Sequence, residues 1–319
     1  MNTLPNKIIL LIVLLQLGAC SSGPAEKPQP VSITSAAQLL DRGVTQYNNN
    51  DYTRASSSFQ KALLQYRSID DQRGIANSCL NLSKTYLATN NNQLAAACLE
   101  KAKTIIKRAS LHDLDEHLAL LKSSLAIKLE AYENSLRILE PVLDSPNPMI
   151  RLAALKNRTY IAFILDHEDR TRWLEQYSSL QQKHAAGNTS HAARVLRFEA
   201  ELSDDETTQQ QLLSSSLHIS RLLADRPAIA ATLLQMAQSD IARQNFKQAE
   251  DRLLRALLIR HQLGDVKSTL ILLEQLQTVY TETGDSKARL TKKWIDRIYA
   301  KELDDWDILF ADFDTYPSP

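Results

Sequence analysis

The densest group of side chains able to do chemistry lies at residues 112–117, with the sequence His-Asp-Leu-Asp-Glu-His. On a helix, His112 and Glu116 would share one face, because residues four apart are neighbours there. Imidazole and carboxylate groups bind Zn²⁺ in proteins, so a metal site is one interpretation. The other is that Asp113 or Asp115 caps the helix that follows, while the remaining side chains face solvent.

Patterns typical of known catalytic sites are absent from the rest of the sequence. It contains no His-Glu-x-x-His zinc motif, no Gly-rich phosphate loop and no Gly-x-Ser-x-Gly nucleophile turn. We therefore expect no catalytic residues, no bound metal and no cofactor, and we expect that the protein is not an enzyme. The alternatives are a lipid-anchored metal-dependent enzyme that uses the 112–117 cluster, or a carrier of a small ligand.

The first residues have the pattern of an export signal. Lys7 is followed by the unbroken apolar run 8–15. A transmembrane helix needs about 20 apolar residues, so this run is too short to span a bilayer and fits the core of a signal peptide.

The segment Leu-Gly-Ala-Cys at 17–20 resembles a bacterial lipobox. The resemblance implies that residues 1–19 are cleaved off as a lipoprotein signal peptide and that lipid is attached to Cys20. An ordinary signal peptide cut near Ala19 is the alternative. Ser21, in place of Asp, favours the outer membrane by the same resemblance. The expected location is therefore the periplasmic face of the outer membrane of a Gram-negative bacterium.

Residues 20–35 have the composition of a flexible tether. They include Pro24, Pro28 and Pro30, with few large apolar side chains. Such a segment cannot bury enough apolar surface to fold. We expect the folded part to begin after it.

Charge and composition exclude some classes of function. Removal of residues 1–19 takes away Lys7 and no acid, so 37 − 1 = 36 basic residues face 37 acidic ones, a net charge of −1. Nucleic-acid-binding domains carry a basic stripe, so we expect no nucleic-acid partner. Seven glycines in 319 residues argue for helices and against a β-sandwich. Cys79 and Cys98 either pair in a disulfide or are small buried residues in neighbouring helices.

A pattern with a period of about 40 residues runs through the chain. It is a trio of small and apolar residues at spacing 0, 4, 7, which is one face of a helix. The trios that begin at Ala55, Ala95 and Ser135 are 40 residues apart, and the next clear trio begins 114 residues on, or three steps of 38, at Ala249. The four clear trios are Ala55-Phe59-Ala62, Ala95-Leu99-Ala102, Ser135-Leu139-Val142 and Ala249-Leu253-Ala256, and two weaker ones are Trp173-Tyr177-Leu180 and Leu213-Leu217-Ser220.

These residues resemble the tetratricopeptide repeat (TPR), whose first helix carries Leu-Gly-x2-Tyr and whose second carries Ala-x3-Phe. Leu82-Ser-x2-Tyr86 matches the first motif with Ser in place of Gly, and Ala55-x3-Phe59 matches the second. The sequence is thus identified as similar to bacterial TPR lipoproteins. The resemblance implies an all-α fold over residues 36–300, a right-handed superhelical solenoid of about seven stacked antiparallel helix pairs.

By the same resemblance, the first helix of each pair lines a concave protein-binding groove. The candidate groove residues are neutral or mixed in charge and contain no Lys/Arg cluster, which argues against a clamp for a chain-terminal carboxylate. They are Asn77, Asn81, Lys84, Arg158, Gln235, Gln238 and Gln275.

The C-terminal segment 301–319 is acidic and aromatic. Trp306, Phe310 and Phe313 have the 0, 4, 7 spacing of one helical face, and no basic residue follows Lys301. The segment either caps the last apolar face of the solenoid or docks onto a partner.

The function that fits best is a scaffold that binds other envelope proteins through its concave surface and the membrane through its lipid. Similar lipoproteins serve pilus secretins, outer-membrane assembly or the peptidoglycan machinery. We expect no small-molecule substrate.

Overall fold

A computed structural model describes residues 31–302, with side chains from residue 34 onward, and within this range the chain is helical and has no strand. The predicted all-α fold is confirmed, with seven antiparallel helix pairs in a right-handed solenoid. Its helices are α2 (Val31–Asn48), α3 (Tyr52–Ser68), α4 (Gln72–Ala88), α5 (Asn92–Arg108), α6 (Asp115–Lys128), α7 (Tyr132–Leu139), α8 (Pro148–Ile164), α9 (Arg170–His184), α10 (Ser190–Leu202), α11 (Glu206–Leu222), α12 (Arg226–Ala242), α13 (Phe246–Gln262), α14 (Val266–Thr283) and α15 (Lys287–Ala300).

The turns between helices explain the long period. In the N-terminal part, a residue with positive φ stands at every twentieth position, and the same spacing returns near the C-terminus. These residues are Asn50, Asp70, Asn90, Ser110 and Glu130, and then Ala224, Gln244, Gly264 and Gly284. A 17-residue helix and a three-residue turn together make 20 residues, so one pair takes 40. Asn and Asp adopt this left-handed conformation more readily than most side chains do.

Each turn also provides the cap of the next helix. The Asp71 carboxylate accepts a hydrogen bond from the backbone N–H of Gly74 at 3.0 Å, and Asp225 and Asp265 cap α12 and α14 in the same way. A capping side chain satisfies an N–H group that the helix itself leaves without a partner. The short polar turns therefore fix both helix ends and the period.

The predicted trios form the contacts inside the helix pairs. Every member of the four clear trios is at most 2% exposed, and Leu213, Leu217 and Ser220 are buried as well. In the fourth pair only the central Tyr177 is fully buried, while Trp173 and Leu180 are half-buried. The second helices thus pack through one face, as the spacing predicts.

The middle of the array departs from the regular spacing. Helix α7 has only eight residues, because Pro141 follows it within a 3-10 turn, Glu140–Val142. The next helix starts at Pro148, where Asn147 is the N-cap and its side chain accepts from the N–H of Met149 at 2.9 Å. A proline suits this first position, since its missing N–H has no partner there.

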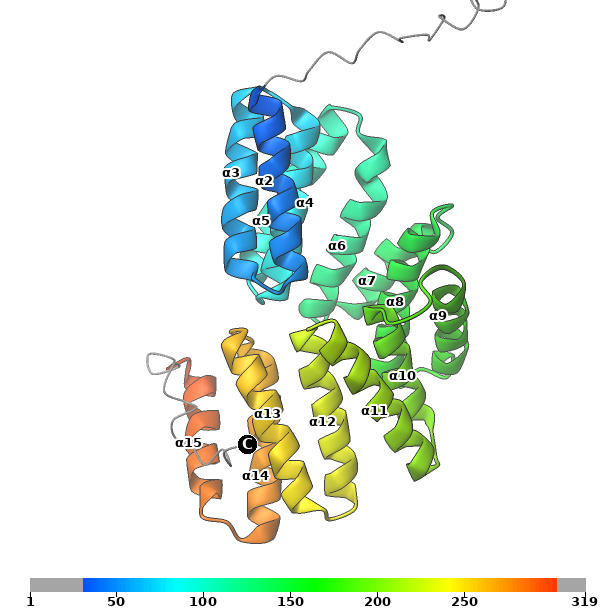
Figure 1. Ribbon diagram of the computed structural model, residues 1–319, viewed down its shortest axis with the longest axis vertical. Coiled ribbons are helices and arrows are strands. Elements are labelled where there is room, and N and C mark those ends of the chain that lie inside the picture. Colours follow the sequence, from blue (N-terminus) through cyan, green and yellow to red (C-terminus); the bar gives the residue numbers. More distant parts are fainter. Residues whose placement is uncertain (1–30, 303–319) are drawn as a thin grey trace, which may run out of the picture.

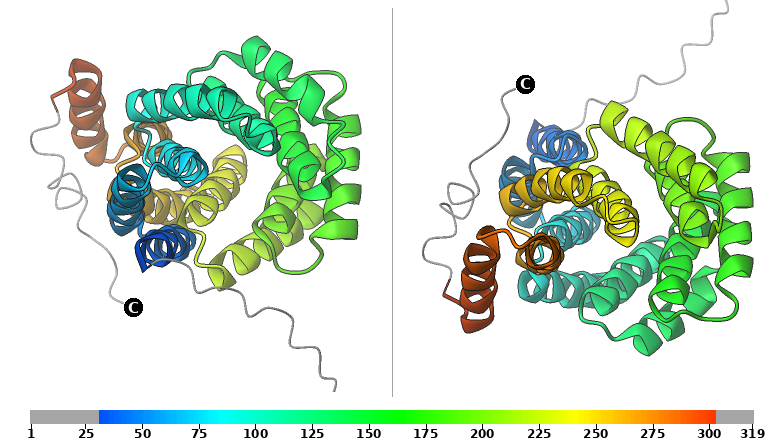
Figure 2. Two further views of the ribbon diagram at one scale, coloured as in Figure 1. Left: turned by 90° about the horizontal axis from the view of Figure 1, so that it is seen from above. Right: turned by 90° about the horizontal axis from the view of Figure 1, so that it is seen from below.

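The solenoid closes on itself. In most of the array, the first helix of one pair packs against the first helix of the next pair. The chain curves so far that α12 to α14 lie beneath α2 to α5 (Figures 1 and 2). Turns of the two layers meet: the side-chain amide of Asn50 donates to the carbonyl of Ala224 at 2.7 Å, and Lys267 pairs with Glu130. The helices therefore surround a central space.

Several sequence predictions fall at or beyond the limits of the described chain. Helix α2 begins at Val31, inside the segment 20–35 that we expected to be a tether. The lipobox with Cys20, and Trp306, Phe310 and Phe313, lie outside the described residues. No helix within residues 31–302 has the length and apolar character needed to cross a bilayer.

The two other cysteines are free thiols. Cys79 is fully buried in α4, and Cys98 is half-buried in the neighbouring helix α5. The pKa of Cys79 is raised to about 12, mainly because the thiol is buried and to a smaller extent because Cys98 is nearby. Of the two alternatives in the sequence, the pair of small buried residues is the one present in this structure.

Candidate binding cavity

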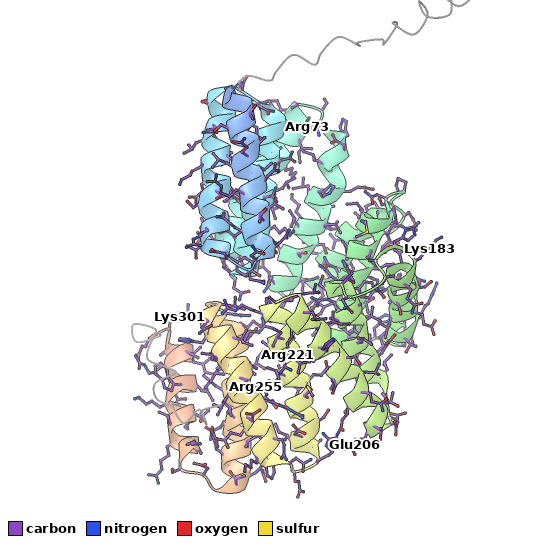
Figure 3. All side chains as sticks on the ribbon, viewed as in Figure 1. Arg73, Lys183, Glu206, Arg221, Arg255 and Lys301 are labelled. Atoms are coloured by element: carbon purple, nitrogen blue, oxygen red, sulfur yellow. The ribbon has the colours of Figure 1, made fainter. Side chains whose placement is uncertain are left out.

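The 112–117 cluster does not converge on a point. Asp113 is engaged by Arg73, with 3.0 Å between Nη2 and Oδ1, while His112 Nδ1 lies 3.1 Å from Asp115 Oδ2. Arg73 lies at the end of the N-terminal layer that points away from α12 to α15 (Figure 3). Within the described part of the chain, no three His, Cys, Asp or Glu side chains gather into a group able to hold a metal ion.

The predicted cap in this cluster is wrong. Leu114 occupies the N-cap position of α6, and no side-chain capping bond forms there. A 3-10 turn, His112–Leu114, runs directly into the helix, and the N–H of Leu114 is bonded to the carbonyl of Leu111 at 2.9 Å. Asp115 therefore lies in the first turn of α6 and does not cap it. There its negative charge interacts favourably with the positive end of the helix dipole.

The central space contains a large cavity of about 1460 Å³. Its walls come mainly from the first helices of pairs three to seven, α6, α8, α10, α12 and α14. Pockets for drug-sized ligands measure about 300–1,000 Å³, so this cavity has room for more than one small molecule. It is the concave surface that the repeat pattern predicts.

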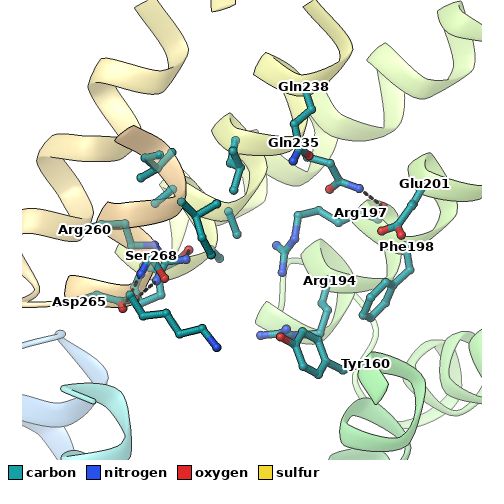
Figure 4. Close-up of a pocket in the computed structure, with 18 of the residues that line it drawn as sticks. Tyr160, Arg194, Arg197, Phe198, Glu201, Gln235, Gln238, Arg260, Asp265 and Ser268 are labelled. Atoms are coloured by element: carbon teal, nitrogen blue, oxygen red, sulfur yellow. Dashed lines mark hydrogen bonds and ion pairs between the residues drawn. The ribbon is translucent and has the colours of Figure 1, made fainter. Parts of the chain in front are cut away.

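Two of the predicted groove residues line the cavity. Gln235 and Gln238 lie on α12 at its wall (Figure 4). The Gln235 side chain donates from Nε2 to the backbone carbonyl of Arg197 at 3.0 Å, so it connects α12 to α10. The Gln238 amide faces the same space, where it can bond to the backbone of a bound chain.

The other five predicted residues do not line the cavity. Asn81 donates to the carbonyl of Asn77 at 2.9 Å, a bond within α4. The Lys84 ammonium lies 4.3 Å from the centre of the Tyr47 ring, and burial lowers the pKa of Lys84. Asn81 therefore bonds within its own helix, and Lys84 contacts α2.

The remaining two also lie outside the cavity wall. Arg158 stacks on Trp173, with 4.5 Å between the guanidinium carbon and the ring centre. Gln275 is half-buried on α14. The structure therefore places Gln235 and Gln238 together and leaves the other five outside the cavity wall.

A basic cluster in this cavity was not predicted from the sequence. Lys156 on α8 and Arg194 and Arg197 on α10 all line it, and Figure 4 shows the Arg197 side chain extending between α10 and α14. The signal was present, because Lys156 and Arg194 are 38 residues apart and so occupy equivalent positions in consecutive repeats. Arg197 and Gln235 are also 38 residues apart, so they too occupy equivalent positions in consecutive repeats.

Two other arginines at the cavity wall are paired with carboxylates. Arg260 Nη1 lies 3.1 Å from Asp265 Oδ2, and the Arg260 side chain also donates to the carbonyl of Pro227. Arg243 pairs with Glu206 and with Asp240. These arginines connect neighbouring helix pairs, so their charges are compensated within the protein.

A half-buried histidine, His191, lies close enough to Lys156 and Arg194 to feel their charges. The Tyr177 hydroxyl is 2.7 Å from His191 Nδ1, and Tyr177 is fully buried. Burial, followed by the charges of Lys156 and Arg194, lowers the pKa of His191 to about 4. His191 is therefore neutral near pH 7, so its ring adds no charge to the cavity.

Comparison with known proteins identifies the fold and no closer relationship. No family model and no curated protein sequence matches the chain. The fold is similar to that of a Rap protein crystallised in complex with competence and sporulation factor. The TM-score is 0.65 at 9% identity, over 87% of this chain and 78% of the Rap chain. At this identity the likeness shows a shared TPR-like solenoid and no more.

Proposed function

We propose that this protein is a non-catalytic scaffold that holds a segment of another protein in its central cavity. The observation that carries the proposal is the cavity itself, which is about 1460 Å³ in volume and lined by the first helices of consecutive pairs. Gln235, Gln238 and Ser268 offer amide and hydroxyl groups to a peptide backbone, while Phe198 and Leu234 offer apolar surface. The wall thus combines hydrogen-bonding and charged groups with apolar surface, as a bound peptide segment requires.

The solenoid fold supports this function. Stacked helix pairs form extended concave surfaces, and repeat proteins use such surfaces for binding. The Rap protein of similar fold was crystallised in complex with competence and sporulation factor, which is consistent with a bound partner here as well.

The location is part of the proposal. The lipobox-like segment 17–20 supports a lipid on Cys20, and Ser21 supports retention in the outer membrane. The scaffold would then face the periplasm, and its partners would be other envelope proteins, such as those of pilus secretins, outer-membrane assembly or the peptidoglycan machinery.

Site-specific cross-linking tests the binding site. A photo-reactive benzoylphenylalanine at Gln238 would face the cavity, whereas the same residue at Ser57, which is exposed on α3, would face outward. We expect a discrete cross-linked product from position 238 in living cells and none of the same mass from position 57. Equal cross-linking from both positions, or none from position 238, would contradict the proposal.

Fractionation tests the anchor. We expect Cys20→Ala to abolish incorporation of labelled palmitate and to release the protein from membranes, while Cys98→Ala retains both. Ser21→Asp should shift the protein from the outer to the inner membrane fraction in a density gradient. A Cys20→Ala protein that stays labelled and membrane-bound would refute the lipid attachment.

A further inference from the structure

Three of the basic residues that line the cavity, on α8 and α10, influence one another electrostatically. Arg194 and Arg197 are three residues apart on α10, so they lie on the same face of that helix. Lys156 comes from α8. The positive charge of Arg194 lowers the pKa of Lys156 and that of Arg197. We name Lys156, Arg194 and Arg197 the basic cluster.

The basic cluster is not neutralised within the described part of the chain. None of its three residues forms an ion pair there, in contrast to Arg243 and Arg260 in the same cavity. Arg197 is only 8% exposed, and its Nη1 has no hydrogen-bond partner. A buried guanidinium without a partner is costly, because it loses its hydration and gains nothing in return.

Mutual repulsion adds to this cost. Burial, followed by the charge of Arg194, lowers the pKa of Lys156 to about 8 and that of Arg197 to about 9. Asp225 acts in the opposite direction on Arg197, but its carboxylate already accepts the N–H of Ala228 as the cap of α12. Glu201 and Asp225 line the same cavity but form no ion pair with the cluster among the described residues, so the folded protein holds three positive charges that a bound anion would neutralise.

The surroundings of the cluster indicate the kind of anion. Arg197 projects into a cavity whose wall also presents Gln235 and Gln238, side chains suited to a peptide backbone (Figure 4). Phe198, next to Arg197 in sequence, adds apolar surface. An arginine binds a carboxylate through two parallel N–H···O bonds, and such charge-assisted bonds are about twice as strong as neutral ones.

We propose that the basic cluster binds a carboxylate group of the protein segment that occupies the cavity, either an acidic side chain or a chain terminus. This inference rests on the proposed function, since it names the chemistry by which the partner is recognised. Arg197 and Arg194 hold the carboxylate oxygens, and Lys156 contributes a third positive charge.

Glutarate, a small dicarboxylate, is a direct probe of this site. In calorimetric titrations of the full chain at constant ionic strength, we expect glutarate to bind and its neutral diamide, glutaramide, not to bind. Arg197→Met should weaken glutarate binding at least tenfold. Arg252→Met serves as the control, because Arg252 is paired with Asp240 and does not line the cavity; its affinity for glutarate should be unchanged.

A stability measurement separates this role from a structural one. Arg197→Met should raise the melting temperature of the ligand-free protein, because it removes an uncompensated buried charge. Arg252→Met should lower it, because it breaks an ion pair with the buried Asp240. If Arg197→Met lowers the melting temperature and leaves glutarate binding intact, the proposal is wrong.

Two further outcomes would overturn it. Inorganic phosphate that binds as tightly as glutarate would show a site without preference for carboxylates, and no glutarate binding to the unaltered protein would show no site. Neither result affects the cross-linking test at Gln238, which reports on a bound protein through a residue outside the cluster. Failure of the carboxylate site and failure of the scaffold function are therefore distinguishable.

Discussion

The Asn50 side chain donates to the backbone carbonyl of Ala224 across 2.7 Å, although 174 residues separate the two in sequence. Both belong to turns between helices, with φ of 60° and 48°. The second contact between the layers, from Lys267 to Glu130, also ends on a turn residue. Polar contacts between helix ends thus join the two layers of the solenoid.

Charge reversal at the second contact should open the solenoid. Lys267→Glu would place two carboxylates opposite each other, and we expect a larger radius of gyration in small-angle X-ray scattering. The melting temperature should change little, since exposed ion pairs contribute about 0–1 kcal/mol. Addition of Glu130→Lys restores the attraction and should restore the radius. An unchanged scattering curve for Lys267→Glu would show that the contact does not hold the layers together.

The basic cluster should make stability depend on pH in an unusual direction. The pKa of Lys156 is about 8 in the folded protein, against about 10.4 when unfolded. Between these values the unfolded chain binds more protons, so the free energy of unfolding should rise with pH. From pH 8 to 9.5 the contribution is about 1–2 kcal/mol, because Lys156 is already half deprotonated at pH 8 and each pKa unit is worth about 1.36 kcal/mol.

Urea unfolding at the two pH values measures this effect. We expect Lys156→Met to remove the rise, so that the difference in stability between variant and unaltered protein shrinks as pH increases. Lys292→Met is a suitable control, because Lys292 is exposed on α15. Parallel pH profiles for Lys156→Met and the unaltered protein would contradict the lowered pKa.

Gly43 is required by the packing of the first helix pair. A Cβ atom at this position of α2 would lie 2.5 Å from the Phe59 ring of α3, and Phe59 is 1% exposed. We expect Gly43→Ala to destabilise the protein by about 1–3 kcal/mol through overpacking, measured by chemical unfolding. Ser57→Ala, on the exposed face of α3, should be neutral within about 0.5 kcal/mol. Comparable effects of the two changes would mean that Phe59 can move aside.

Asp240 is a buried charge that connects two helices. It is 3% exposed and pairs with Arg243 at 3.0 Å and with Arg252. Asp240→Ala would leave Arg252 without an ion-pair partner and Arg243 with Glu206 alone, so we expect a loss of about 3–5 kcal/mol in the free energy of unfolding. The exposed pair of Asp251 with Arg255 is the control, and Asp251→Ala should cost less than about 1 kcal/mol. A loss below 1 kcal/mol for Asp240→Ala would show that water replaces the carboxylate.

The architecture was predictable because packing repeats. Ala55, Ala95 and Ser135 occupy the same place in successive pairs and are fully buried, so the 40-residue period reports a physical contact. The middle of the array is harder to read, since Pro141 shortens α7 and the 20-residue turn spacing is lost there. The weaker pattern reflects a real irregularity in the structure.

The binding cavity was less predictable, for a geometric reason. Which face of each helix points inward depends on the curvature of the whole array, and Asn77 and Gln275 were assigned to the groove from position alone. The basic cluster joins two consecutive repeats, so neither repeat shows it by itself. An alignment of Lys156 with Arg194 at the 38-residue step would have revealed it.

Contact between the first and last layers fixes how many helix pairs this chain can have. Arrays of repeats ordinarily gain or lose whole units in evolution at little cost, because each unit touches only its neighbours. Here, removal of one internal pair would carry Ala224 away from Asn50 and Lys267 away from Glu130 together. Duplication or loss of a repeat would therefore change the ring as a whole, so relatives of this protein that bind in the same manner should keep the same number of units.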